Sequence, residues 1–141
     1  MVNPEKIDNL LQTLQSVVNQ LRAIARFEHD EFIKNDTIIG GAKYYLQTAI
    51  ETCINIGTHI IASEGFRKPK DYREVFTILN EQDVFPDNFT IILRKMAGLR
   101  NRLVHLYWDV DEEQIYNYLC DNLGDFDTFA HYIVEFVKKK S

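Results

Sequence analysis

Apolar residues recur every three or four positions along the N-terminal part of the chain. The series begins at Ile7 and ends at Ala25, and its steps repeat every seven residues. On a helix this spacing forms one continuous apolar stripe. Asn3 can cap such a helix, and Pro4 can occupy its first position, where the missing N–H costs nothing. The pattern predicts a long amphipathic helix that packs against other helices.

The stretch from Ile38 to Ile61 is apolar on more than one side. A helix that is so broadly apolar belongs at the centre of a bundle or against a second subunit. Asp36 or Thr37 can cap this helix, and residues 63–65 end it with a glycine. The charged segment before it, residues 26–35, is predicted to be a break or a short turn.

Further helical patterns follow. Residues 72–80 have a short apolar face, and a helix that begins at Pro86 carries its apolar face up to His105. Asp111, with Gln114 three residues later, makes a start like a capping box for the last region, which is interrupted near residues 122–124. No alternation typical of strands is present. The pattern predicts an all-α fold, an antiparallel four- to five-helix bundle formed by one domain over residues 1–141.

Composition agrees with this prediction. Of the 141 residues, 45% are hydrophobic and 26% are charged, while the 6 Gly and 3 Pro are few for a many-stranded sheet. Cys53 and Cys120 lie in apolar or mixed helical surroundings without CxxC spacing, so we expect small buried thiols rather than a disulfide. The N-terminus has no basic segment followed by an apolar one, and no apolar run is long enough to span a bilayer. We therefore expect a cytosolic protein.

The distribution of charge is more informative than its sum. A net charge of −5 argues against a general nucleic-acid coat protein. From residue 88 to residue 108, however, there is no Asp or Glu, while Arg94, Lys95, Arg100 and Arg102 all fall inside. This local basic charge indicates a site that handles an anion. Arg94 and Lys95 are candidates for contact with RNA, although a solvated helix face explains them equally well.

The segment from Gly98 to Asp109 contains the residues suited to chemistry. Asn101 and His105 are four apart and share a helix face, whereas Arg100 lies roughly 140° around from His105. Arg100 can meet the imidazole if the helix loosens at its end, or if a two-fold partner supplies its counterpart. Cleavage of RNA by its 2′-hydroxyl needs a group with a pKa near 7, which His supplies, and a cation on the phosphate, which Arg supplies. Asn can orient either group, and no metal is required.

A purely structural interpretation of the same segment stays open. A helix face with two Arg, one Asn and one His is ordinary on a soluble protein. His105 can cap the last carbonyls of its helix, and Tyr107 with Trp108 can belong to the core.

The motif resembles that of a known family. Arg100 and His105, with Asn101 in the polar position between them, match the Arg-x4–6-His signature of the HEPN ribonucleases. Tyr107 extends the match to the Arg-x4-His-x-Tyr form of HepT toxins. The flanking residues 96–99 and 108–111, and residues 45–51 of the central helix, are also similar to that family.

The resemblance implies a dimeric helical bundle that brings two motifs together in a cleft and cleaves RNA without metal or another cofactor. Under this hypothesis we expect His105 to be the acid/base, Arg100 the phosphate stabiliser and Asn101 the orienting group, with Arg102 as a secondary phosphate contact. The resemblance also implies a partner, an MntA-like nucleotidyltransferase antitoxin that transfers AMP onto Tyr107. A bulky anion two residues from the histidine would repel a phosphate substrate.

Two other interpretations remain: a non-catalytic HEPN binding module that partners a nucleotidyltransferase, and a structural bundle without a site. The second leaves the acid-free basic stretch unexplained. Glu51 is a candidate partner of a motif arginine. His59 is predicted to be a core or interface histidine, while His29 and His131 have no companions at ligand spacing. The acidic run 109–113 suits helix capping better than a metal site, and no Gly-rich phosphate loop is present.

Overall fold

The computed structural model describes residues 1–105 and 110–140 of the chain. Over these ranges it is helical, without a strand, which confirms the predicted all-α class. The helices are α1 (Pro4–Ala25), α2 (His29–Ile33), α3 (Asp36–Glu64), α4 (Tyr72–Glu81), α5 (Asp87–Val104), α6 (Glu112–Asp121) and α7 (Gly124–Lys140). None of these helices combines the length and the hydropathy that crossing a membrane requires.

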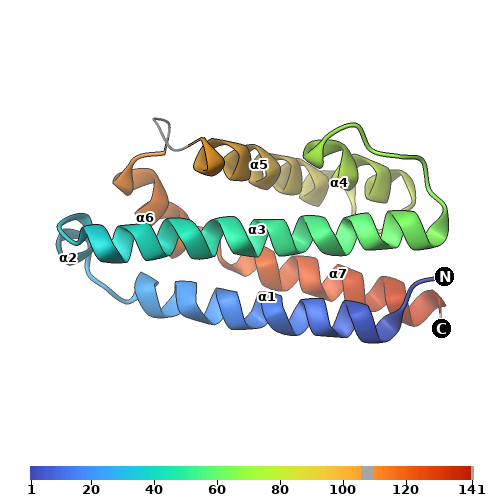
Figure 1. The fold of residues 1–141 in the computed structure, drawn as a ribbon, viewed down its shortest axis with the longest axis horizontal. Helices are drawn as coiled ribbons and strands as arrows, with labels where there is room; N and C mark the ends of the chain where they lie inside the picture. Colours follow the sequence, from blue (N-terminus) through green and yellow to red (C-terminus); the bar gives the residue numbers. More distant parts are fainter. Residues whose placement is uncertain (106–109, 141) are drawn as a thin grey trace.

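Four helices run along the long axis of the molecule with alternating direction: α1, α3, α5 and α7 (Figure 1). Short helices occupy the two ends. Helices α2 and α6 lie at the left-hand end of the view, and α4 lies beside α5 at the right. Both termini lie at the right-hand end (Figure 1). The antiparallel bundle is therefore confirmed, with the break before α7 in the predicted place.

Helix α3 is the centre of the bundle. It contacts α1, α4 and α5 along its length, and α2 and α6 near one end. Its apolar side chains are buried on several sides, as its broad apolar pattern predicts. Gly57 lets α4 approach closely: a Cβ there would lie 2.6 Å from a methyl of Val75 and 3.1 Å from a methyl of Leu79. Helix α4 in turn packs on α5, and so covers one side of the helix that carries the motif.

Side-chain caps fix where the helices begin. The Asn3 Oδ1 accepts hydrogen bonds from the backbone N–H groups of Glu5 and Lys6, at 3.1 and 3.2 Å, which confirms the predicted cap of α1. Asp111 accepts from the backbone N–H of Gln114 at 2.8 Å, also as predicted. The cap of α3 was assigned wrongly to Asp36 or Thr37. Asn35 caps this helix instead, since its side chain accepts from the Ile38 N–H at 3.1 Å.

Two further predictions were wrong. The segment 26–35 is not only a turn, because it contains α2, whose Phe32 is fully buried and fastens the helix to the core. Cys120 is exposed rather than buried, since it lies on the outer face of α6 while Ile115 and Leu119 face the core. The expectation holds for Cys53, which is buried, and this burial raises the pKa of its thiol.

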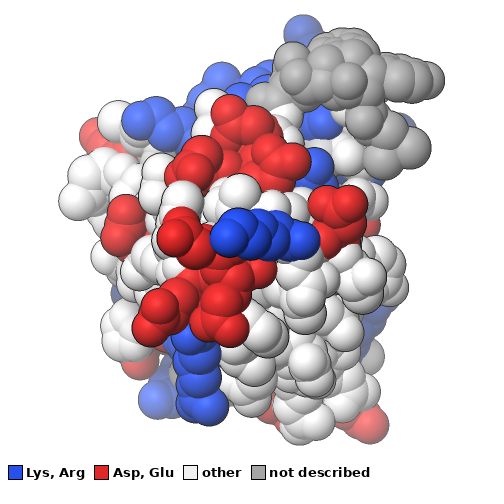
Figure 2. Space-filling model, turned by 90° about the vertical axis from the view of Figure 1, so that its left-hand side faces the viewer, with Lys and Arg blue, Asp and Glu red and all other residues white. Residues whose placement is uncertain are grey.

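Exposed carboxylates gather at the end of the bundle where α2 and α6 meet (Figure 2). His29 of α2 lies among them: its Nδ1 is 3.0 Å from Asp30, and its Nε2 is 2.6 Å from a carboxylate oxygen of Glu113 on α6. The ring also packs edge-on against Tyr116. The hydrogen bonds to Asp30 and Glu113 favour the imidazolium and raise the pKa of His29.

This contact predicts a stability that depends on pH. Because the folded pKa of His29 lies above its unfolded value of about 6.5, the stabilisation is complete below that pH. It is lost as the pH rises through the folded pKa. We expect His29→Gln to lower the melting temperature most in mildly acidic buffer and least in alkaline buffer. Thermal melts across that range test this, with His131→Gln on the exposed face of α7 as control. A loss independent of pH would show that only the ring contact with Tyr116 matters.

Candidate functional site

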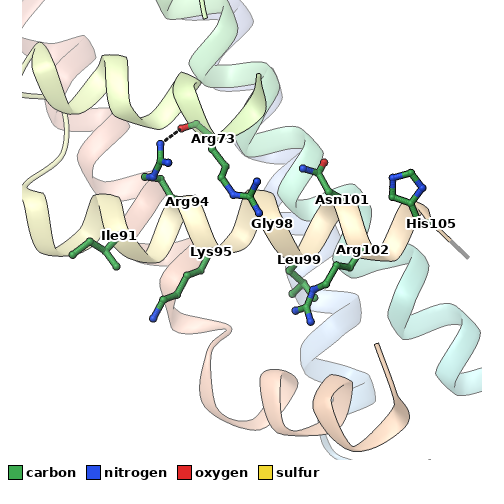
Figure 3. Close-up of a pocket in the computed structure, with 9 residues that line it drawn as sticks. All are labelled: Arg73, Ile91, Arg94, Lys95, Gly98, Leu99, Asn101, Arg102 and His105. Atoms are coloured by element: carbon green, nitrogen blue, oxygen red, sulfur yellow. Dashed lines mark hydrogen bonds between the residues drawn. The ribbon is translucent and has the colours of Figure 1, made fainter. Parts of the chain in front are cut away.

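An open cavity of about 680 Å³ lies along α5, where α4 packs beside it (Figure 3). It is lined by Arg73, Ile91, Arg94, Lys95, Gly98, Leu99, Asn101, Arg102 and His105. The structure thus brings together five of the predicted site residues around one cavity. All five belong to α5 or its C-cap.

The lining of the cavity is strongly basic. It holds the cations Arg73, Arg94, Lys95 and Arg102, and none of the described residues that line it is acidic. Three of these cations come from the acid-free stretch of the sequence. The fourth, Arg73, comes from the first turn of α4, and no sequence pattern marked it. A concave surface of one sign of charge concentrates anions, because its field is not cancelled locally.

Asn101 and His105 lie on the same side of α5 and point in the same direction, as their spacing predicts (Figure 3). The backbone N–H of His105 donates to the Asn101 carbonyl at 3.3 Å and closes the last turn. His105 itself leaves the helical conformation, with φ −83° and ψ 89°. Its side chain is therefore presented at the exposed end of the helix.

Arg100 does not line the cavity. Its Nε and Nη2 donate to one oxygen of Glu51 on α3, at 2.9 and 2.8 Å, and the guanidinium carbon lies 4.7 Å from the ring centroid of Tyr72 on α4. The predicted pairing of Glu51 with a motif arginine is confirmed. Of the two ways in which Arg100 could meet the imidazole, loosening of the helix is not seen before its C-cap, because α5 stays helical through Val104.

One contact links Arg100 to the cavity wall. Its Nη1 donates to the Asn101 Oδ1 at 3.3 Å. Asn101 therefore stands between the arginine, which faces α3 and α4, and the cavity on the other side. The Arg100 side chain is only 19% exposed, so α3 and α4 fix its position.

The remaining cations of α5 point to two different edges of the helix. Arg94 Nη1 donates to the Thr77 hydroxyl at 2.5 Å and to the Arg73 carbonyl at 3.4 Å, which fastens it to α4 (Figure 3). Lys95 and Arg102 point to the opposite edge of α5 in the same view. The cavity thus has one edge fixed by α4 and one edge open to solvent.

Other candidate groups lie apart from this cavity. His59 receives hydrogen bonds from the Asn3 N–H at 3.4 Å and, on the same Nε2, lies 3.3 Å from the Ser63 hydroxyl, which agrees with a structural role. Among residues 1–105 and 110–140, no three His, Cys, Asp or Glu side chains form a group that could hold a metal ion. Tyr107, the predicted modification site, lies outside the described residues.

An antiparallel helical bundle with an Arg-x4-His motif at the end of one helix, beside a basic cavity, defines a protein of the HEPN class. The family described as Ribonuclease HepT-like matches residues 8–133, and the chain belongs to this family.

Curated relatives and a solved structure agree. The mRNA nuclease HepT of Shewanella oneidensis is 26% identical over 131 residues, which cover 90% of this chain and 95% of that protein. The tRNA nuclease HepT of Aphanizomenon flos-aquae is 22% identical, covering 94% and 90%. The tri-AMPylated HEPN toxin of Shewanella oneidensis, solved in complex with the MNT antitoxin, superposes with a TM-score of 0.85 at 26% identity, covering 92% and 96%.

The ion pair between Arg100 and Glu51 generates a prediction. Both side chains are partly shielded from water, at 19% and 35% exposure, and Arg100 makes two bonds to one carboxylate oxygen. We expect Glu51→Gln and Arg100→Gln each to lower stability, and the double variant to lose less than the sum. The expected coupling is about 1 kcal/mol, because partial exposure screens the pair. Urea unfolding of the four proteins measures it, and strict additivity would contradict the pairing.

Proposed function

We propose that this protein is the toxin of a toxin–antitoxin system, a metal-independent endoribonuclease that acts in the cytosol as a homodimer. The observation that carries the proposal is the cavity in which His105 and Asn101 stand beside four cations, with no carboxylate among the described residues that line it. An RNA backbone offers the matching chemistry, a chain of phosphates with a nucleophilic 2′-hydroxyl beside each. Membership of the Ribonuclease HepT-like family supports the same activity.

In the proposed reaction the 2′-oxygen of RNA attacks the adjacent phosphorus, and the bond from phosphorus to the 5′-oxygen breaks. His105 accepts the proton of the 2′-hydroxyl or donates one to the leaving 5′-oxygen, since an imidazole serves both purposes near neutral pH. A dimer supplies two such histidines, one for each step. The products are a 2′,3′-cyclic phosphate and a free 5′-hydroxyl, so this step consumes no water, and the proposed scheme requires no metal.

Arg100 and Asn101 would stabilise and orient the phosphate. The charge that builds up on the phosphoryl oxygens requires a cation, and Arg100 lies one hydrogen bond behind Asn101. Glu51 holds the guanidinium in place, and Asn101 can turn its amide toward a bound phosphate oxygen. Arg102, Arg94 and Lys95 would contact neighbouring phosphates along the strand.

The proposed regulator is an MntA-like nucleotidyltransferase antitoxin that transfers AMP from ATP onto Tyr107. The solved relative that superposes on this chain is an AMPylated toxin bound to its antitoxin. Tyr107 is two residues from His105, so an adduct there would bring a phosphate and a nucleotide next to the cavity. Its charge would repel the RNA backbone, and its bulk would compete for the same space.

A second candidate is a non-catalytic module that binds RNA or the nucleotidyltransferase. The position of Arg100 favours it, because the motif arginine is committed to Glu51 and does not line the cavity. Under this alternative the four cations bind an anionic partner, and His105 does not transfer protons.

Cleavage of a mixed RNA pool by the purified protein in EDTA separates the two candidates. We expect the wild type to cleave, and His105→Ala to lower the rate by at least about 100-fold, because general acid/base catalysis contributes on that order. His131→Ala is the matched control, an exposed histidine on α7 that does not line the cavity. Equal rates in wild type and His105→Ala would refute the assignment. Binding without cleavage by any variant, with Tyr107 shown by mass to be unmodified, would favour the binding module.

The regulation is tested separately. Incubation with the partner nucleotidyltransferase and ATP is expected to add AMP mass to the wild type and to stop its cleavage of RNA. Tyr107→Phe keeps the ring but removes the acceptor hydroxyl, so it should gain no mass and should stay active under the same conditions. If the Tyr107→Phe protein gained the same AMP mass as the wild type, another residue would be the modification site.

A further inference from the structure

Arg73 differs from the other cations around the cavity. It is carried by α4 rather than α5, and its side chain extends across to Gly98 on the cavity wall (Figure 3). Among residues 1–105 and 110–140, its guanidinium has no ion-pair or hydrogen-bond partner. Arg94 is bonded to Thr77, and Arg100 is bonded to Glu51. Within the described part of the chain, Arg73 is therefore a cation of the cavity whose donors are available.

The position of Arg73 depends on the absence of a side chain at residue 98. A Cβ on Gly98 would lie 2.6 Å from the Arg73 Nη2 and 3.4 Å from its Cζ, so the guanidinium occupies the space that a side chain would fill. Gly98 lies within α5, where glycine is less favourable than alanine by about 1 kcal/mol. The local cost of this glycine is understandable if the arginine needs that position.

Helix α4 is held firmly enough to place the guanidinium. Asp71 caps its first turn by accepting from the Glu74 N–H at 2.8 Å, and the Arg73 carbonyl itself accepts from Arg94. Val75 and Leu79 then pack into the space left by Gly57. Contacts with α3 and α5 thus fix the backbone around Arg73, while its side chain extends over the cavity.

We propose that Arg73 binds a backbone phosphate of single-stranded RNA in this cavity, and that Gly98 is a positioning residue that leaves room for its guanidinium. The inference rests on the proposed function, since it names a further substrate contact of the same site. A planar guanidinium with free donors suits a phosphate, which it can bind through two parallel hydrogen bonds. The phosphate would lie between α4 and α5, along the edge that Asn101 and His105 share.

The test measures RNA binding without cleavage. Proteins that carry His105→Ala are titrated in EDTA with a short fluorescein-labelled single-stranded RNA at several salt concentrations. Adding Arg73→Ala should weaken binding about tenfold at low salt and reduce the slope of log K against log salt by about 0.7, the value for one phosphate contact on a single strand. Arg26→Ala, which removes the same charge from an exposed position at the end of α1, should change neither.

Gly98→Ala separates position from charge. The added Cβ displaces the far end of a flexible side chain, so the fold should persist while the guanidinium leaves its place. We expect Gly98→Ala to weaken binding when Arg73 is present and to have no further effect in the Arg73→Ala protein. Melting temperatures of all variants show whether the bundle is intact.

Each outcome has a distinct meaning. If Arg73→Ala binds RNA like Arg26→Ala while the protein with His105 cleaves RNA, the inference is overturned and the proposed ribonuclease stands. If Gly98→Ala weakens binding equally with and without Arg73, the positioning role is overturned. If none of the proteins binds or cleaves RNA, the inference and the proposed function fail together.

Discussion

Helix α3 is apolar around most of its circumference, and no single neighbour can remove that much surface from water. Burial of this surface therefore requires several helices at once, and α1, α4 and α5 pack along it. The consequence reaches the functional site directly. Glu51 belongs to the same helix and projects between the neighbours, where it bonds Arg100 of α5. The helix that organises the core thus also places the motif arginine.

Helix α4 is short, but it shapes the site more than its length suggests. It approaches α3 at Gly57, stacks Tyr72 on the guanidinium of Arg100, and bonds Arg94 through Thr77. In the same turn it carries Arg73 over the cavity wall. Packing and site geometry are linked here. A shift of α4 on α5 would displace Arg73 and would disturb the contacts that hold Arg94 and Arg100.

The electrostatics of the molecule are divided between regions. Although the chain carries a net charge of −5, the cavity along α5 is basic, and exposed carboxylates gather at the end formed by α2 and α6 (Figure 2). Fields of exposed charges fade over about 8–10 Å at physiological salt, so each region acts locally. The basic lining therefore attracts an anion to the cavity although the chain as a whole is acidic.

The sequence by itself determined the helical class, the order of the main helices and the local chemistry of the motif. Helical periodicity is a short-range property, and Asn101 with His105 share a face because they are four residues apart on one helix. The acid-free stretch likewise marked Arg94, Lys95 and Arg102, which line the cavity.

Only the tertiary structure decided which groups meet across helices. The sequence analysis missed the short helix α2, because this helix is stabilised by burial of Phe32 against α3 and α6, which follow later in the chain. Cys120 is exposed because a period of 3.6 residues left it outside the apolar face of α6, and the pattern alone did not fix that face. The packing of α3, α4 and α5 places Arg73 at the cavity and places Arg100 against Glu51. Such contacts depend on the distances between helices, which sequence spacing within one helix does not contain.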